Sequence, residues 1–339
     1  MDARLALVSG LAVFLASSAL ARDLRITVEH GYEFVTIDAP GNRGYEGFGH
    51  FQWGEGWGAV DYTYRMARSE VGTGEWLEFV NSASRLSSNP FLWMTPSQWG
   101  GMFTAPGSAQ LRPDIEHAAR IPVRGLNFLQ FAMYCNWLHN DKQVTTDALL
   151  TGAYDLAGDG YTVDSPRLTS LIEREPDARF WIPSLDEWTK AVYFDPDAED
   201  EDFPGEGRYW LNPYGSDEVP TPGYPGEEGA QTSGGINYAP PPGEPFTQWI
   251  PLGAYPDSQT PWGLLDASGG ASELTSRYEG TRFWTKGLYT GQSPSSNADL
   301  VYGASAGGSF GLRLASAIPA PATAPILLIA LSAPPRRRR

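Results

Sequence analysis

The stretch Gln259-Thr-Pro-Trp-Gly-Leu-Leu-Asp-Ala-Ser-Gly-Gly-Ala-Ser-Glu-Leu274 bears most directly on the fold of this chain. It places two carboxylates, Asp266 and Glu273, on either side of the Gly269-Gly270 pair. Calcium binds about six to eight oxygens at 2.3–2.6 Å and combines carboxylates with backbone carbonyls. A glycine turn with an acid at each end can supply such a set. A solvated turn is the commoner interpretation of this pattern, and the pattern alone leaves both open.

The same stretch resembles the signature loop of the formylglycine-generating-enzyme-like family, the sulfatase-modifying factor domain. The resemblance rests on Pro261-Trp-Gly-Leu264, on the two acids and on the glycine between them. It implies a structural calcium ion held by the Asp266 and Glu273 side chains and by the carbonyls of Gly269 and Ala271. The family has Asn, Trp and Trp where this chain has Gly270, Ser272 and Leu274.

Further segments of the family pattern follow one another in the same order. They are an opening strand and helix at Tyr62–Val71 and Gly74–Ser84, a central helix at Asn127–Leu138, an L-P-S/T-E-x-E-W-like box with its helix at Phe180–Tyr193, and a closing strand at Ser309–Ala315. The resemblance therefore covers nearly all of residues 22–316, which we expect to form one domain. It implies an α+β fold, an elaborated C-type-lectin-like formylglycine-generating-enzyme fold. The 38 glycines, 28 prolines and 12 tryptophans suit a loop-rich fold with short strands, few helices and an aromatic core.

A second calcium site of the family matches residues 237–246. Its implied ligands are the side chains of Asn237 and Glu244 and the carbonyls of Tyr238 and Phe246. Glu244 stands where the family usually has Asp, so its carboxylate reaches one methylene further. A loop without an ion remains an equal alternative for this segment.

Charge and cysteine content exclude several classes of function. The formal net charge of −16 argues against a nucleic-acid partner, because phosphate binding requires patches of Lys and Arg. A single cysteine rules out any disulfide within the chain. Bound metal is then the remaining way to cross-link long loops.

Both ends of the chain have the composition of targeting segments. Met1–Ala21 combines an early Arg4, the apolar run Leu5–Leu15 and an A-x-A site, which predicts a secretory signal peptide. Residues 317–339 combine a Pro-rich spacer, a short apolar run and four arginines, and resemble a PEP-CTERM sorting tail with Pro319-Ala-Pro321 in place of Pro-Glu-Pro. This resemblance implies bacterial export, transient membrane passage through the tail and an exosortase as processing partner. A disordered basic tail is the alternative.

The chemistry of the catalytic family members is missing from the sequence. Those members oxidise a sulfatase cysteine with O₂ and copper held by two cysteine thiolates, and soft Cu(I) needs such ligands. The segment from Thr285 to Leu312 that should carry them has no cysteine, and we expect the only one, Cys135, to be a buried packing residue. Gly303-Ala-Ser-Ala-Gly307 matches the nucleophile-elbow string, but no histidine follows it, so we expect a loop there.

These features favour a secreted or cell-surface protein that binds rather than catalyses. We expect calcium as a structural cofactor, no copper, and extracellular polysaccharide, matrix or a surface protein as the partner. The alternative is a divergent formylglycine-generating oxidoreductase acting on a sulfatase cysteine. Neither the ligand nor the oligomeric state follows from the sequence.

Overall fold

The computed structural model describes residues 25–47, 55–88, 95–165, 170–218, 225–226, 250–267, 269, 271–279, 282–287, 302–305 (backbone only) and 310–319. The predicted signal peptide, almost all of the predicted sorting tail and the whole of the predicted calcium site at residues 237–246 lie outside these residues. Within the described part, no helix has the length and apolar character needed to cross a bilayer.

The main sheet joins the two ends of the domain. Its five strands are all antiparallel and stand in the order β1-β2-β3-β12-β6. Their bounds are Ile26–Glu29, Tyr32–Ile37, Tyr64–Ala67, Ala315–Ser316 and Phe180–Trp181. The closing strand is shorter than the Ser309–Ala315 expected, and it lies between β3 and β6. The last described segment therefore contributes an interior strand of the sheet and not an edge strand.

A second, three-stranded sheet follows the signature stretch. It has the order β11-β10-β9, with bounds Tyr302–Ser305, Arg282–Lys286 and Glu273–Glu279. The expectation of a loop at Gly303–Gly307 is wrong for its first three residues, which belong to β11. Gly303 and Ala304 are paired with Trp284 and Phe283 of β10, so small residues in this strand lie opposite aromatic ones. Two hairpins complete the strands: Gly101–Ala105 with Ser108–Leu111 (β4, β5) and Phe194–Asp195 with Arg208–Tyr209 (β7, β8).

The helices are few and begin at recognisable caps. They are α1 Thr73–Ala83, α3 Phe128–His139, α4 Thr146–Leu150 and α5 Leu185–Tyr193, with short 3₁₀ turns η1 Ser84–Leu86 and η2 Ala118–Arg120. Asn127 and Gln130 form a reciprocal capping box at the start of α3, and Ser184 and Glu187 form another at the start of α5. Each box satisfies two backbone N–H groups that a helix start otherwise leaves unpaired.

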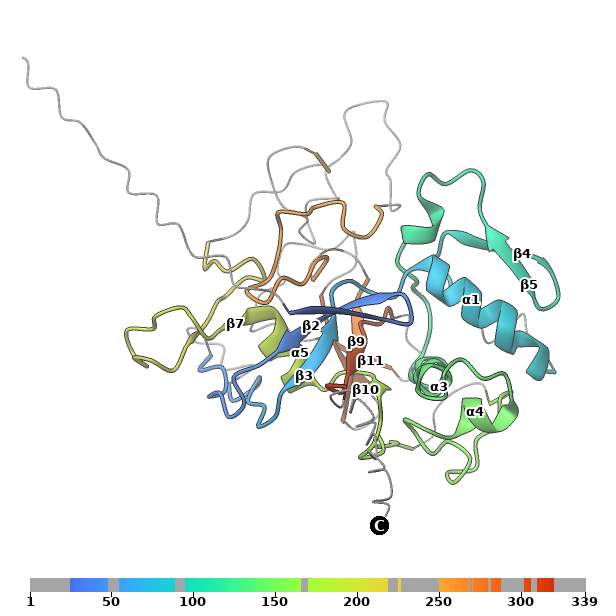
Figure 1. Ribbon diagram of the computed structural model, residues 1–339, viewed down its shortest axis with the longest axis horizontal. Helices are drawn as coiled ribbons and strands as arrows, with labels where there is room; N and C mark the ends of the chain where they lie inside the picture. The colour runs from blue at the N-terminus through green and yellow to red at the C-terminus, as the bar shows by residue number, and fades with distance from the viewer. Residues whose placement is uncertain are drawn as a thin grey trace, which may run out of the picture.

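Helix α3 is buried on every side. The spacing of Leu129, Ala132, Met133 and Trp137 places them near one face, but all residues from Phe128 to Leu138 are buried. The helix packs between α1, α4 and the strands, where it is seen nearly end-on in Figure 1. An aromatic cluster of Trp76, Phe79, Tyr134 and Trp137 joins it to α1, with ring centroids 5.1–5.8 Å apart. A helix enclosed in this way needs no polar face.

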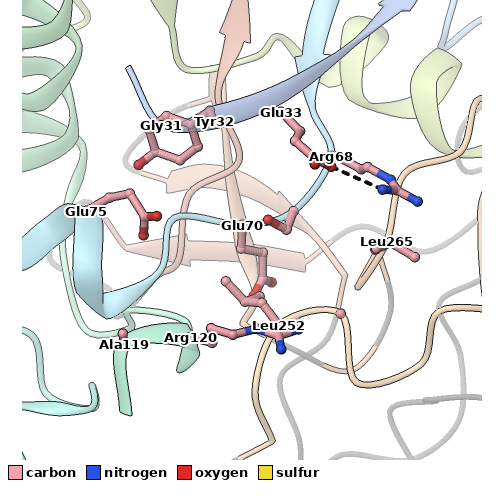
Figure 2. Close-up of a pocket in the computed structure, with 12 residues that line it drawn as sticks. Gly31, Tyr32, Glu33, Arg68, Glu70, Glu75, Ala119, Arg120, Leu252 and Leu265 are labelled. Carbon is pink, nitrogen blue, oxygen red and sulfur yellow. Dashed lines mark hydrogen bonds and ion pairs between the residues drawn. The ribbon is translucent and has the colours of Figure 1, made fainter. Parts of the chain in front are cut away.

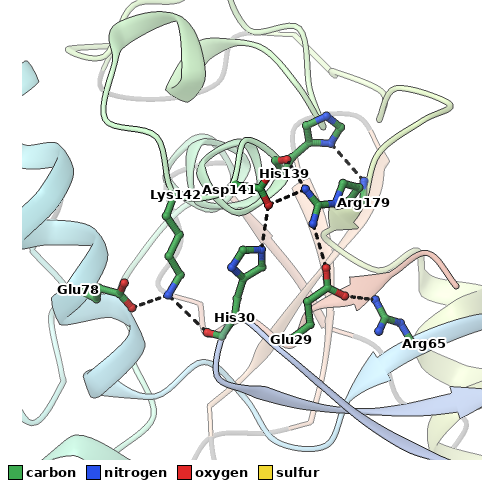
Figure 3. Close-up of polar contacts among 8 residues, drawn as sticks. All are labelled: Glu29, His30, Arg65, Glu78, His139, Asp141, Lys142 and Arg179. Carbon is green, nitrogen blue, oxygen red and sulfur yellow. Dashed lines mark hydrogen bonds and ion pairs between the residues drawn. The ribbon is translucent and has the colours of Figure 1, made fainter. Parts of the chain in front are cut away.

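Ion pairs and hydrogen bonds connect the β1–β2 hairpin to neighbouring elements, including the residues that follow α3 (Figure 3). Glu29 accepts hydrogen bonds from Arg65 at 2.6 Å and from Arg179 at 3.0 Å. Burial opposes ionisation of this carboxyl, but the two guanidinium groups outweigh it and lower the pKa of Glu29. On the same side, Lys142 donates to Glu78 at 2.6 Å and to the carbonyl of His30. The β1–β2 turn is thereby tied to both α1 and α3.

The buried amide of Asn136 provides a test of this core. Its Nδ2 donates to the carbonyls of Leu149 and Tyr154, at 3.0 and 2.9 Å, and its Oδ1 accepts from the N–H of Tyr154 at 2.8 Å. We expect Asn136→Ala to lower the free energy of unfolding by about 3 kcal/mol or more, because buried polar groups that lose their partners cost roughly 1–3 kcal/mol each. Urea unfolding measures this change.

The matched control is Asn140→Ala. Asn140 also donates to two carbonyls, those of Ala148 and Thr151, but it is partly exposed and water can replace its amide. An equal loss of stability in the two variants would contradict the importance assigned to Asn136.

Candidate functional site

A completely buried ion pair lies behind the signature loop. The guanidinium of Arg313 donates to Glu273 Oε1 through Nε at 3.1 Å and through Nη2 at 2.8 Å, and to Oε2 through Nε at 3.0 Å. Arg313 and Glu273 are 0% and 1% exposed. The Nε1 of Trp188, from α5, also donates to Glu273 Oε2. Both oxygens of this predicted calcium ligand therefore already accept hydrogen bonds from the protein.

The remaining donors of Arg313 bind the surrounding backbone. Nη1 donates to the carbonyls of Ala67 and Arg68 at 3.1 and 2.8 Å, and Nη2 donates to that of Leu265 at 2.8 Å. One side chain thus joins the end of β3, the signature stretch and the start of β9. Two residues before Arg313, Gly311 lets the backbone lie directly against Ala271 of the signature stretch. A Cβ at position 311 would collide with the Cβ of Ala271.

The other residues of the predicted site lie around the same pair. Asp266 has a left-handed backbone (φ 56°), and its Oδ2 accepts the N–H of Gly253 at 2.7 Å. Burial raises the pKa of Asp266 to about 6. Gly269 also has positive φ, at 94°, as a glycine turn requires. The carbonyl of Ala271 faces Gly287, as does that of Ala267.

Two members of the cluster, Arg313 and Glu70, are not among the residues predicted from the sequence. Glu70 is 1% exposed, and its Oε1 accepts the N–H of Ala271 at 2.8 Å, so it supports the signature loop from behind. Burial, together with the nearby charge of Glu273, raises the pKa of Glu70 well above its usual value. The sequence did contain a signal that Glu70 is buried. Glu70 lies in the run Arg68-Ser-Glu-Val71, directly after a strand that enters the core.

The charges of this cluster do not balance when all its groups are ionised. Glu70, Asp266 and Glu273 carry three negative charges against the single positive charge of Arg313. A buried cluster of this kind must take up protons or a cation. Among the described residues, no three His, Cys, Asp or Glu side chains are arranged to hold a metal ion. The predicted calcium site uses two side chains and two carbonyls, and it stays a prediction. Binding at Glu273 would require that carboxylate to share its oxygens with Arg313.

Calcium removal tests this site. If the signature loop binds Ca²⁺, EDTA should lower the melting temperature and added CaCl₂ should restore it, because a ligand that binds only the folded state stabilises it. Asp266→Asn should abolish the calcium response. This variant is preferable to Glu273→Ala, which would leave Arg313 buried without its partner.

Asp155→Asn is the matched control, since Asp155 lies in an exposed turn and caps the N–H of Gly158 at 2.9 Å. It should keep the full calcium response. A melting temperature that is insensitive to EDTA and CaCl₂ would contradict the predicted site.

Comparison with known proteins supports a shared fold. No family model matches the chain. No curated protein matches it either. Its structure is similar to the crystal structure of CarF, with a TM-score of 0.52 and 17% sequence identity over 86% of this chain and 100% of that one. It is also similar to Treponema denticola variable protein 1, with a TM-score of 0.50 and 13% identity over 87% of this chain and 99% of that one. The chain thus shares its overall mixed α+β, loop-rich architecture with these proteins.

Proposed function

We propose that the chain is a secreted or cell-surface binding protein without catalytic activity, built on a C-type-lectin-like, formylglycine-generating-enzyme-like scaffold. The observation that carries this proposal is the complete burial of Cys135, the only cysteine of the chain. Cys135 is 0% exposed in the middle of α3, and burial raises its pKa far above the usual value. A thiol of this kind is a packing group, because metal binding and nucleophilic attack both need an accessible thiolate.

The scaffold supports binding more than oxidation. Copper chemistry of the formylglycine-generating type needs a thiolate pair, and this chain contains one cysteine in total. Loops held by a rigid frame can still present a ligand surface after a catalytic centre is lost. The signal-peptide-like start and the sorting-tail-like end favour extracellular polysaccharide or matrix as the ligand.

The surface we assign to this ligand contains Trp57 and Trp284. Their ring centroids are 6.5 Å apart, and both side chains are partly exposed. Trp284 donates through Nε1 to Glu279 at 3.2 Å, and next to Trp57 the N–H of Gly58 donates to Asp186 at 3.0 Å. Sugar rings have apolar C–H faces that pack on aromatic rings, and hydroxyl groups that donate to carboxylates. Paired tryptophans beside two carboxylates suit both requirements.

Binding to immobilised extracellular polysaccharides tests the proposal. The purified chain should be retained, and Trp57→Ala combined with Trp284→Ala should weaken retention about tenfold or more, since a buried aromatic contact contributes on the order of 1–3 kcal/mol. Trp210→Ala is the control for removing a partly exposed tryptophan, because Trp210 packs under Arg208 near the other hairpin.

Two results would contradict the proposal. One is oxidation of a sulfatase cysteine peptide to its aldehyde by the purified chain with copper and O₂. The other is the absence of retention on every polysaccharide tested. Unchanged retention of the double variant would instead contradict the assignment of the tryptophan surface.

A further inference from the structure

A cavity of about 410 Å³, seen in close-up in Figure 2, lies against the signature stretch at Leu265. Its walls come from the β1–β2 turn, the segment after β3, the first turn of α1, η2 and the residues around Leu252 and Leu265. Its polar lining consists of Glu33, Arg68, Ser69, Glu70, Glu75 and Arg120. None of these residues belongs to the surface assigned to polysaccharide.

The two arginines of the cavity are already engaged. Arg68 pairs with Glu33 at 3.1 Å and donates to the carbonyl of Gly263. Arg120 donates to the carbonyl of Leu252. Glu33 is thereby neutralised at the rim, and the dashed line in Figure 2 marks its ion pair.

The other two carboxyl groups have no cationic side chain bound to them in the described structure. Glu75 is held by backbone N–H groups, its own and that of Gly72, while burial raises its pKa. Glu70 receives one N–H bond, from Ala271, on Oε1. The positive charge of Arg313 acts on Glu70, but its guanidinium binds Glu273. The cavity therefore has an excess of acceptor groups over donors.

Glu70 Oε2 is the decisive atom. It is buried and accepts no hydrogen bond from the described residues. Figure 2 shows the Glu70 side chain directed into the cavity, toward Leu252 and Arg120. A buried carboxyl oxygen without a donor is unfavourable, and the pKa of Glu70, raised by burial, reflects the lack of a bound cation that would stabilise its ionised form. The position of this carboxyl against a cavity points to a cation that arrives from outside the chain.

We propose that this cavity binds a small organic cation through a primary ammonium group that donates to Glu70, with Glu75 as a second carboxylate nearby. The cavity is much larger than a single metal ion needs, and Tyr32, Leu252 and Leu265 give part of its wall an apolar character that suits an aliphatic chain. The described residues also contain no cluster of three metal-ligating side chains. An alkylammonium ion satisfies both the acidic and the apolar parts of the wall.

Isothermal titration of the full chain with 1,4-diaminobutane tests this site, with 1,4-butanediol and glutarate as neutral and anionic probes of similar length. We expect saturable binding of the diamine alone. Glu70→Gln should weaken it about tenfold or more, the value of one charge-assisted hydrogen bond. Glu33→Gln is the matched control and should change the affinity less than about twofold, because Arg68 already neutralises Glu33.

Glu75→Gln provides a second variant should Glu70→Gln not fold, and it should also weaken diamine binding. The proposal is overturned if the diamine gives no binding up to about 10 mM, a range that covers millimolar affinity. It is equally overturned if the diol binds as well as the diamine, if the folded glutamine variants keep full affinity, or if added CaCl₂ alone occupies the site and the diamine does not. The double tryptophan variant should bind diamine normally, which separates this site from the polysaccharide surface.

Discussion

The Arg313–Glu273 pair is the interaction on which the rest of the structure depends. Two fully buried charges lie in direct contact, and the remaining guanidinium donors bind carbonyls from the end of β3 and from the signature stretch. Removing such ions from water costs several kcal/mol each, and only complete hydrogen bonding compensates for that cost. The pair therefore adds little net stability, but any arrangement that separates its segments leaves a buried charge unpaired.

That constraint explains how a loop-rich chain without disulfides keeps one arrangement. Strand β12, which begins two residues after Arg313, lies between β3 and β6, and this keeps Arg313 beside the end of β3. Trp188 connects the pair to α5, and Glu70 holds the loop at Ala271 by accepting its N–H. The aromatic cluster of α1 and α3 fills the core beside it. Polar contacts thus fix the register of the loops, while apolar burial supplies the driving force for folding.

Much of the frame could be predicted from local signals. The helices α1, α3 and α5 and the burial of Cys135 were all expected, because the sequence patterns that indicate them each span only a few positions. Long-range pairings could not be predicted in this way. The roles of Glu70 and Arg313 depend on contacts with residues 201 and 40 positions away. The strand at Gly303 was missed for the same reason, since its partner in β10 defines it.

The most direct measurement is a double-mutant cycle on the buried pair, using Arg313→Met, Glu273→Gln and their combination, with stability measured by urea unfolding. The account predicts that Arg313→Met loses about 3–5 kcal/mol or fails to fold, and that the two sites are coupled by more than about 1 kcal/mol. Arg277→Met, in an exposed pair on β9, should lose less than about 1 kcal/mol. An Arg313→Met variant as stable as Arg277→Met, with no coupling to Glu273, would contradict the account.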